Sequence, residues 1–207
     1  MSSKTRFSVI AAAFFCLSLV NSAKADTVTF AIGNNPQPNE ENVLLSNGTT
    51  GATVFGLTNQ SNILVQFTST TDTLSEPSNG QARIEALDGT LNNVTISIPG
   101  GSFEDIIFNP FFGAGNATVT ATTLGNQSFT FIYALGNGQN FLSIFDVGSA
   151  FSSVTISAVG GFTDLRQVRV SGAQVAPQGS PIPEPATLFL LGSGLVGLGS
   201  AVRKRRL

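Results

Sequence analysis

Catalysis by this chain would have to rest on carboxylates, because its sequence lacks the other side chains that commonly act as bases or nucleophiles. There is no His and a single Cys, Cys16, so the commonest general base, the commonest metal ligand and a disulfide framework are excluded. Between positions 26 and 180 there is also no Lys to activate a serine nucleophile. The acids that could support glycoside hydrolysis are Glu76, Glu85, Asp88, Glu104 and Asp105. No spacing pairs two of them across a cleft, so we interpret them as solvated carboxylates and predict that the protein is not an enzyme.

Calcium binding is the other chemistry that carboxylates offer an extracellular domain, because Ca²⁺ prefers hard oxygen ligands. Asp88, Glu104, Asp105 and Asp146 are candidate ligands. They lack the loop spacing that identifies a calcium site. We therefore predict no cofactor and keep a structural Ca²⁺ as the open alternative.

The charges of the chain are unevenly distributed. Its overall formal charge is −2, but between Asp26 and Ser180 there are three basic and eleven acidic residues, a net charge of −8. The three basic residues are Arg83, Arg166 and Arg169. A domain this acidic repels phosphate backbones, so we predict no nucleic-acid partner.

Carbohydrate binding is the strongest functional alternative, although the aromatic residues favour it only weakly. Sugars usually stack on Trp or Tyr, and the chain has no Trp and one Tyr, Tyr133, in an alternating apolar segment that predicts a core position. Phe111 and Phe112 form an apolar pair in a loop-like context. We expect this loop to pack against the core, with a small binding surface as the alternative.

The central part of the chain, residues 26–172, predicts strand after strand. Period-two apolar patterns bounded by Gly, Asn and Pro turns indicate about ten strands and an antiparallel β-sandwich of jelly-roll type. The segments are Val28–Ile32, Ile63–Phe67, Val94–Ile98, Phe129–Leu135, Phe141–Phe145, Val154–Ala158 and Val168–Val170. Phe141–Phe145 is apolar on both faces, which predicts a central buried strand, and Gly160-Gly161 predicts a turn. Thr118, Thr120 and Thr122 alternate as in a hydroxyl-bearing ice-binding face, but over one strand only.

The N-terminal 25 residues have the three parts of a secretory signal peptide. Lys4 and Arg6 precede an apolar run, 7–20, that includes Cys16. Ala23 and Ala25 place small residues where a signal peptidase cleaves. We predict cleavage after Ala25, with an uncleaved anchor as the alternative.

The C-terminal end also has three parts. After a linker, 173–182, come Pro183, Glu184 and Pro185, which are stiff and extended. Residues 186–202 follow without a charge and would form a helix of about 25 Å, near the lower limit for crossing a bilayer. The basic tail should stay cytoplasmic and leave the N-terminal bulk outside; it consists of Arg203, Lys204, Arg205 and Arg206.

This end of the chain resembles the PEP-CTERM sorting signal, which has the same three parts in the same order over residues 183–207. The resemblance implies processing by an exosortase, a membrane-embedded cysteine transpeptidase, in a Gram-negative bacterium that makes exopolysaccharide. It also implies that Glu184 is the recognised charge. A simple C-terminal anchor with a proline-rich stalk is the alternative.

Together these features predict an exported protein of the cell surface or extracellular matrix. It would be held transiently in the inner membrane by residues 186–202, with its C-terminus cytoplasmic, and then processed. Its partners would be signal peptidase, the exosortase-type transpeptidase, the membrane and, if the ectodomain binds glycans, exopolysaccharide. For the ectodomain we predict a non-catalytic structural or adhesive role, with a carbohydrate-binding module as the alternative.

Overall fold

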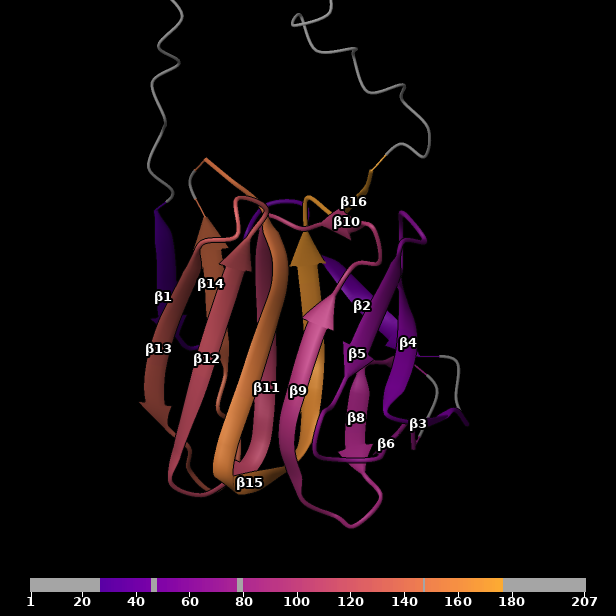
Figure 1. Ribbon diagram of the computed structural model, residues 1–207, viewed down its shortest axis with the longest axis vertical. Helices are drawn as coiled ribbons and strands as arrows, with labels where there is room; N and C mark the ends of the chain where they lie inside the picture. Colours follow the sequence, from indigo (N-terminus) through magenta and orange to yellow (C-terminus); the bar gives the residue numbers. More distant parts are fainter. Residues whose placement is uncertain (1–26, 46–47, 78–79, 147, 177–207) are drawn as a thin grey trace, which may run out of the picture. The chain divides into compact units, whose positions relative to one another are not determined.

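The computed structural model describes residues 27–45, 48–77, 80–146 and 148–176, and these are folded as antiparallel β-structure (Figure 1). The first eight strands are β1 (Val28–Ile32), β2 (Glu41–Leu45), β3 (Thr50–Gly51), β4 (Thr53–Thr58), β5 (Leu64–Thr68), β6 (Leu74–Ser75), β7 (Gly80–Gln81) and β8 (Arg83–Ala86). The others are β9 (Leu91–Ser97), β10 (Gly101–Ser102), β11 (Asp105–Gly113), β12 (Asn116–Thr123), β13 (Ser128–Ala134), β14 (Leu142–Asp146), β15 (Phe151–Ser171) and β16 (Gln174–Val175).

The strands form a sandwich of two layers that share the 21-residue strand β15. Its first half, 153–157, pairs with β12 on one side and β9 on the other. Its second half, 164–171, pairs with β11 on one side and with β8 and β2 on the other. We call the layer around the first half the front layer, which faces the viewer in Figure 1, and the other the back layer.

The order of the strands is that of a jelly roll. The front layer runs β13–β12–β15–β9 and continues through β5 and β4, and the back layer runs β1–β14–β11–β15–β8. Along the chain, β8, β9, β11, β12, β13, β14 and the two halves of β15 occupy the eight positions of two interlocked Greek keys. The predicted antiparallel sandwich of jelly-roll type is therefore confirmed.

Strand β15 folds over from one layer to the other at the predicted turn Gly160-Gly161, where the structure keeps one continuous strand. Gly161 has a φ of 65°, a conformation that favours glycine, and a Cβ there would lie 2.3 Å from Thr90 Cγ2. A Cβ on Gly160 would lie 2.7 Å from the carbonyl oxygen of Ala114. The two glycines therefore allow neighbouring strands to approach the bend closely.

The core lies between the layers and is formed by the inward-facing residue of each alternating pair. β12 shows the pattern clearly: Ala117, Val119 and Ala121 are fully buried, whereas the threonines between them are half-exposed. Tyr133 is buried as predicted, and its hydroxyl donates to the carbonyl oxygen of Asn140 at 3.2 Å. β14 lies between β1 and β11 and buries residues on both faces, which confirms the predicted central strand.

The two ends of the sandwich are built differently. At one end β2 joins the layers, because Val43–Leu45 pair with β4 while Glu41 and Asn42 pair with the second half of β15. At the other end β13 and β1 are the outermost described strands, and Phe131 stacks on Phe30 with ring centroids 5.2 Å apart. One end is thus closed by backbone pairing and the other by side-chain packing.

Candidate functional site

The outer face of the back layer carries all three arginines of the described residues. Arg83 lies on β8, and Arg166 and Arg169 lie on the second half of β15. Arg166 is the cross-strand partner of Arg83. Pairing therefore brings together the few cations of an acidic domain, although the first two lie far apart in the sequence.

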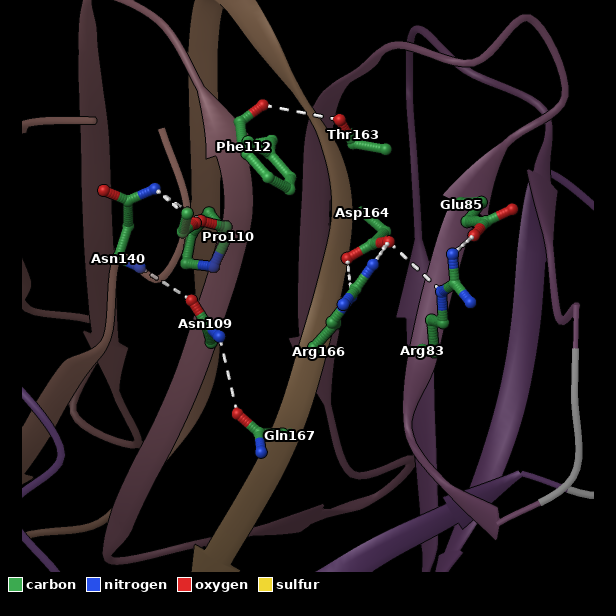
Figure 2. A network of polar contacts seen from close by, with 11 residues as sticks. Arg83, Glu85, Asn109, Pro110, Phe112, Asn140, Thr163, Asp164, Arg166 and Gln167 are labelled. Carbon is green, nitrogen blue, oxygen red and sulfur yellow. Dashed lines mark hydrogen bonds and ion pairs between the residues drawn. The ribbon is translucent and has the colours of Figure 1, made fainter. Parts of the chain in front are cut away.

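A fully buried carboxylate, Asp164, lies between two of these arginines (Figure 2). Its Oδ2 accepts from Arg83 Nε at 3.1 Å and from Arg166 Nη2 at 2.6 Å, and its Oδ1 pairs with Arg166 Nε. Arg83 also pairs with Glu85 at 2.5 Å. A buried carboxylate requires charged partners. Because Asp164 contacts both guanidinium groups, it fixes their positions.

Aromatic rings extend this network toward β11. The guanidinium of Arg166 stacks over Phe111, 3.7 Å from the ring centroid, and Phe111 packs edge-on against Phe112 at 4.3 Å. Both phenylalanines lie within β11, so the prediction that they occupy a loop is wrong. The pattern Asn-Pro-Phe-Phe-Gly indicated a loop, but Pro110 is accommodated within the strand, next to a β-bulge between Ile107 and Asn109.

A chain of amides continues the network on the same face (Figure 2). The side-chain oxygen of Asn109 accepts from the backbone N–H of Asn140 at 2.7 Å, and its nitrogen donates to Gln167 Oε1 at 3.4 Å. Asn140 in turn donates to the carbonyl oxygen of Pro110 at 2.9 Å. The bonds link β11, β15 and the segment before β14, so the amides lie in defined orientations.

Next to this chain lies a small polar pocket of about 170 Å³, which we call the arginine–amide pocket. It is lined by Asn34, Asn42, Gln81, Phe141, Gln167 and Arg169. Arg169 is held by Asn34 Oδ1 and by an ion pair with Glu40 at 3.1 Å, and Gln81 donates to Asn42 at 2.9 Å. Amide and guanidinium groups offer donors and acceptors for sugar hydroxyls, and an aromatic ring offers an apolar surface.

The outer face of the front layer has a different chemistry. One cross-strand row consists of six threonines on six strands: Thr130, Thr120, Thr155, Thr95, Thr68 and Thr53. The next row contains Ser128, Thr122, Ser153, Ser97 and Gln66. None of the strands β4, β5, β9, β12, β13 and the first half of β15 contains a charged residue. We call this surface the hydroxyl face.

The sequence suggested alternating hydroxyl side chains on one strand only. The structure shows that the hydroxyl face extends over six strands. Its hydroxyls bond one another, as between Thr95 and Thr155 at 2.8 Å and between Thr120 and Thr130 at 3.4 Å. Cross-strand pairs of this kind stabilise a sheet.

An apolar groove of about 320 Å³ lies where the hydroxyl face reaches β2, β4 and β5. Leu44, Phe55, Leu57 and Leu64 line it, each about two-fifths exposed. Gly56 lies on β4 between Phe55 and Leu57 but faces the buried side, and a Cβ there would lie 2.6 Å from Val43 Cγ1. The glycine thus allows close contact of β4 with β2.

The carboxylates considered for catalysis make structural contacts instead of facing a shared cleft. Glu85 pairs with Arg83, and Asp88 accepts from the backbone N–H of Thr90 at 3.1 Å. The buried Glu76 accepts from the backbone N–H of Phe55 at 3.2 Å.

The remaining acids, Glu104 and Asp105, lie together near Ser171. Burial raises the pKa of Asp105, with a smaller contribution from Glu104, against the hydrogen bond from Ser171. Of the residues considered as calcium ligands, Asp88 lies apart from this pair, and the side chain of Asp146 is outside the described residues. No group of three or more potential ligands occurs in the part of the chain that the structure describes.

The sorting and processing residues lie outside the described residues. These are Ala23, Ala25, Pro183, Glu184, Pro185, Arg203, Lys204, Arg205 and Arg206, together with the predicted membrane helix 186–202. Within the described ranges, no helix is long and apolar enough to cross a membrane. Two residues of the predicted linker, Gln174 and Val175, form β16 and pair with β10.

Comparison with protein families supports the interpretation of the C-terminal end. Residues 181–206 match the family described as PEP-CTERM protein-sorting motif. The chain therefore carries this motif, which implies export to the cell surface and processing by an exosortase. No curated protein matches the chain.

Similar solved structures include variants of CBM29-2, a family 29 carbohydrate binding module. One variant is 12% identical and has a TM-score of 0.28, with 72% of this chain and 90% of that chain covered. Another, determined with cellulohexaose, is 11% identical and has a TM-score of 0.28, with 70% and 89% covered. Scores this low carry no functional argument, and the jelly-roll assignment rests on the strand order.

Sequence reasoning singled out neither Asp164 nor the amides that line the pocket. The one available signal was that Arg166 and Arg169 follow Asp164 at short spacing in a segment otherwise poor in charge. Their partners come from β2, β7, β8 and the segment before β2, so only the pairing of distant strands assembles the site.

Proposed function

We propose that this chain is an exported surface or matrix protein that is processed at both ends. Signal peptidase removes residues 1–25. The segment 186–202 holds the protein in the inner membrane until an exosortase-type enzyme acts at Pro183–Glu184–Pro185. The observation that carries this proposal is the match of residues 181–206 to the sorting motif.

For the ectodomain we propose a non-catalytic structural or adhesive role. Two features support it. Glu76 and Asp105 accept bonds that join separate elements of the fold, and Glu85 and Asp88 accept bonds within their own strand or turn. In addition, the hydroxyl face spans six strands without a charge, an extended surface suited to contact with other polymers rather than to turnover of a small substrate.

The test of processing is the intact mass of the protein recovered from its native host. The wild type should lack residues 1–25 and the apolar C-terminal segment. Glu184→Ala should keep that segment and remain in the membrane fraction. If both forms extend to Leu207, the motif is not processed and the protein is a plain anchored protein.

A second candidate is glycan binding at the arginine–amide pocket. Four amides and Arg169 line a cavity of about 170 Å³ beside the ring of Phe141, and this combination suits sugar hydroxyls and an apolar sugar face. The ion pairs of Arg83, Arg166 and Arg169 leave the surrounding face close to neutral, which favours a neutral over an acidic glycan.

Titration of the exported protein with exopolysaccharide purified from its host separates the two roles of the ectodomain. Glycan recognition predicts saturable binding that is insensitive to moderate salt, because no net charge is neutralised. A purely structural role predicts no saturable binding to the dissolved polymer.

A further inference from the structure

Among the described residues, β13 is the outermost strand of the front layer and has one edge without a paired strand. Its described partner is β12 alone, in a register that pairs Ser128 with Thr122 and Ala134 with Asn116. The N–H of Leu135 donates to Gly115 at 2.8 Å, so the odd-numbered residues bond β12 and the even-numbered ones point their backbone groups outward. Ser128, Thr130, Ile132 and Ala134 thus present donors and acceptors to a further strand.

This edge lacks the features by which β-proteins avoid pairing with other strands. Free edges are usually protected by Lys, Pro, bulges or short length. β13 has seven residues, Ser-Phe-Thr-Phe-Ile-Tyr-Ala, without a charge, a proline or a register shift against β12. Ile132 is 59% exposed on its outer face. The opposite end of the same layer has no such opening, because β2 connects it to the back layer.

We propose that β13 is an assembly edge that pairs antiparallel with β13 of a second copy of this chain. In a twofold pairing, the backbone of each β13 both donates hydrogen bonds to the other copy and accepts them from it. The hydroxyl rows of the two copies then form one continuous surface. The charge distribution is compatible with a second copy: although net-negative domains repel one another, the strands of the front layer carry no charge, so two copies can approach through this layer without that repulsion. Burial of Ile132 adds an apolar contribution.

Thiol crosslinking of the full chain in its host tests this assembly. Thr130→Cys places a thiol at the free edge, and Thr53→Cys places one at the far end of the same threonine row. A short bismaleimide should join two chains through position 130 and give a band of twice the chain mass. Each yield is normalised to labelling by N-ethylmaleimide, and the parent chain controls for Cys16.

The decisive variant adds Ile132→Lys to Thr130→Cys. Ile132 points outward from β13 and is largely exposed, so the fold tolerates the substitution, whereas pairing would bring two lysines close together. We expect loss of the crosslinked dimer to the level of Thr53→Cys. The proposal is wrong if Thr130→Cys gives no more dimer than Thr53→Cys, if Ile132→Lys leaves the dimer unchanged, or if position 130 is joined to a different protein.

Discussion

The side chains on the two outer faces of this jelly roll are held in place by different kinds of contact. On the back layer, Asp164 fixes two arginines and a chain of amides connects neighbouring elements. On the front layer, hydroxyls repeat from strand to strand without a charge. The back layer therefore offers a single site with defined geometry, whereas the front layer offers a repetitive surface that ends at an open edge. Under our two proposals, glycan recognition and assembly would use opposite sides of one core.

The largest effect should come from removing the buried charge of the back layer. Asp164→Asn leaves Arg83 and Arg166 without their common partner. We expect the free energy of unfolding to fall by about 3 kcal/mol. This is at the low end for a broken buried ion pair, because both arginines are partly exposed. Urea unfolding of the variant and the wild type measures it. A loss below that of Thr155→Val would show that Asp164 does not hold the two arginines.

The bend that connects the two faces should be the next most sensitive position. Gly161→Ala introduces a Cβ at a positive φ and 2.3 Å from Thr90. We expect a loss of about 2 kcal/mol from backbone strain and the displaced neighbour, measured by the same unfolding experiment. Gly100→Ala serves as the control, because its φ of 66° matches that of Gly161 but a Cβ there would have no atom within 4 Å. Equal losses would show that strain alone, and not close packing at the bend, determines the effect.

At the margin of the front layer a single carboxylate, Asp72, holds the start of β9. Partial burial alone raises the pKa of Asp72, but side-chain bonds from Thr71 and Asn92 and the backbone N–H groups of Asn92 and Asn93 outweigh it and lower the pKa below its ordinary value.

The stabilisation by Asp72 is therefore complete above its unfolded pKa and is lost as pH falls through its folded pKa. Asp72→Asn should cost about 1 kcal/mol at pH 7, after allowance for solvent screening, and progressively less as the pH is lowered toward 2. Unfolding of variant and wild type at both pH values measures this difference, and a pH-independent cost would contradict the ionic origin of the bonds.

The smallest effect should come from the hydroxyl face itself. Thr155→Val removes the hydrogen bond to Thr95 but keeps a β-branched side chain, so we expect a change of about 0.5 kcal/mol. Urea unfolding again measures it. A loss as large as that of Asp164→Asn would mean that the hydroxyl rows support the fold as strongly as the charged network does, and the contrast between the faces would disappear.

The alternating segments predicted the fold class well because burial on one face imposes a period of two. β1, β5, β9, β13 and β14 closely match predicted segments, although β9 begins three residues earlier than predicted. The predicted turn at Gly160-Gly161 is a bend within β15. Glycine permits a turn as well as a bent strand, and the close contacts with Thr90 and Ala114 at this bend form only when distant strands pack together.

The candidate site was predictable only in part. The three arginines could be identified as the scarce cations of an acidic domain, but their grouping around Asp164 depends on the register of β8 with β15. That register aligns Arg166 with Arg83 and Asp164 with Glu85. No local pattern specifies it, because such pairs are brought together by folding of the whole chain.

The most direct test of the ectodomain account compares one residue type on the two faces. Asn42→Ala with Gln81→Ala removes amides from the arginine–amide pocket, whereas Gln66→Ala removes one from the hydroxyl face. If the pocket binds glycan, titration with host exopolysaccharide should show binding weakened about tenfold or more by the first pair of substitutions and unchanged by Gln66→Ala. If Gln66→Ala weakens binding as much, or if both variants bind like the wild type, recognition does not occur at the pocket.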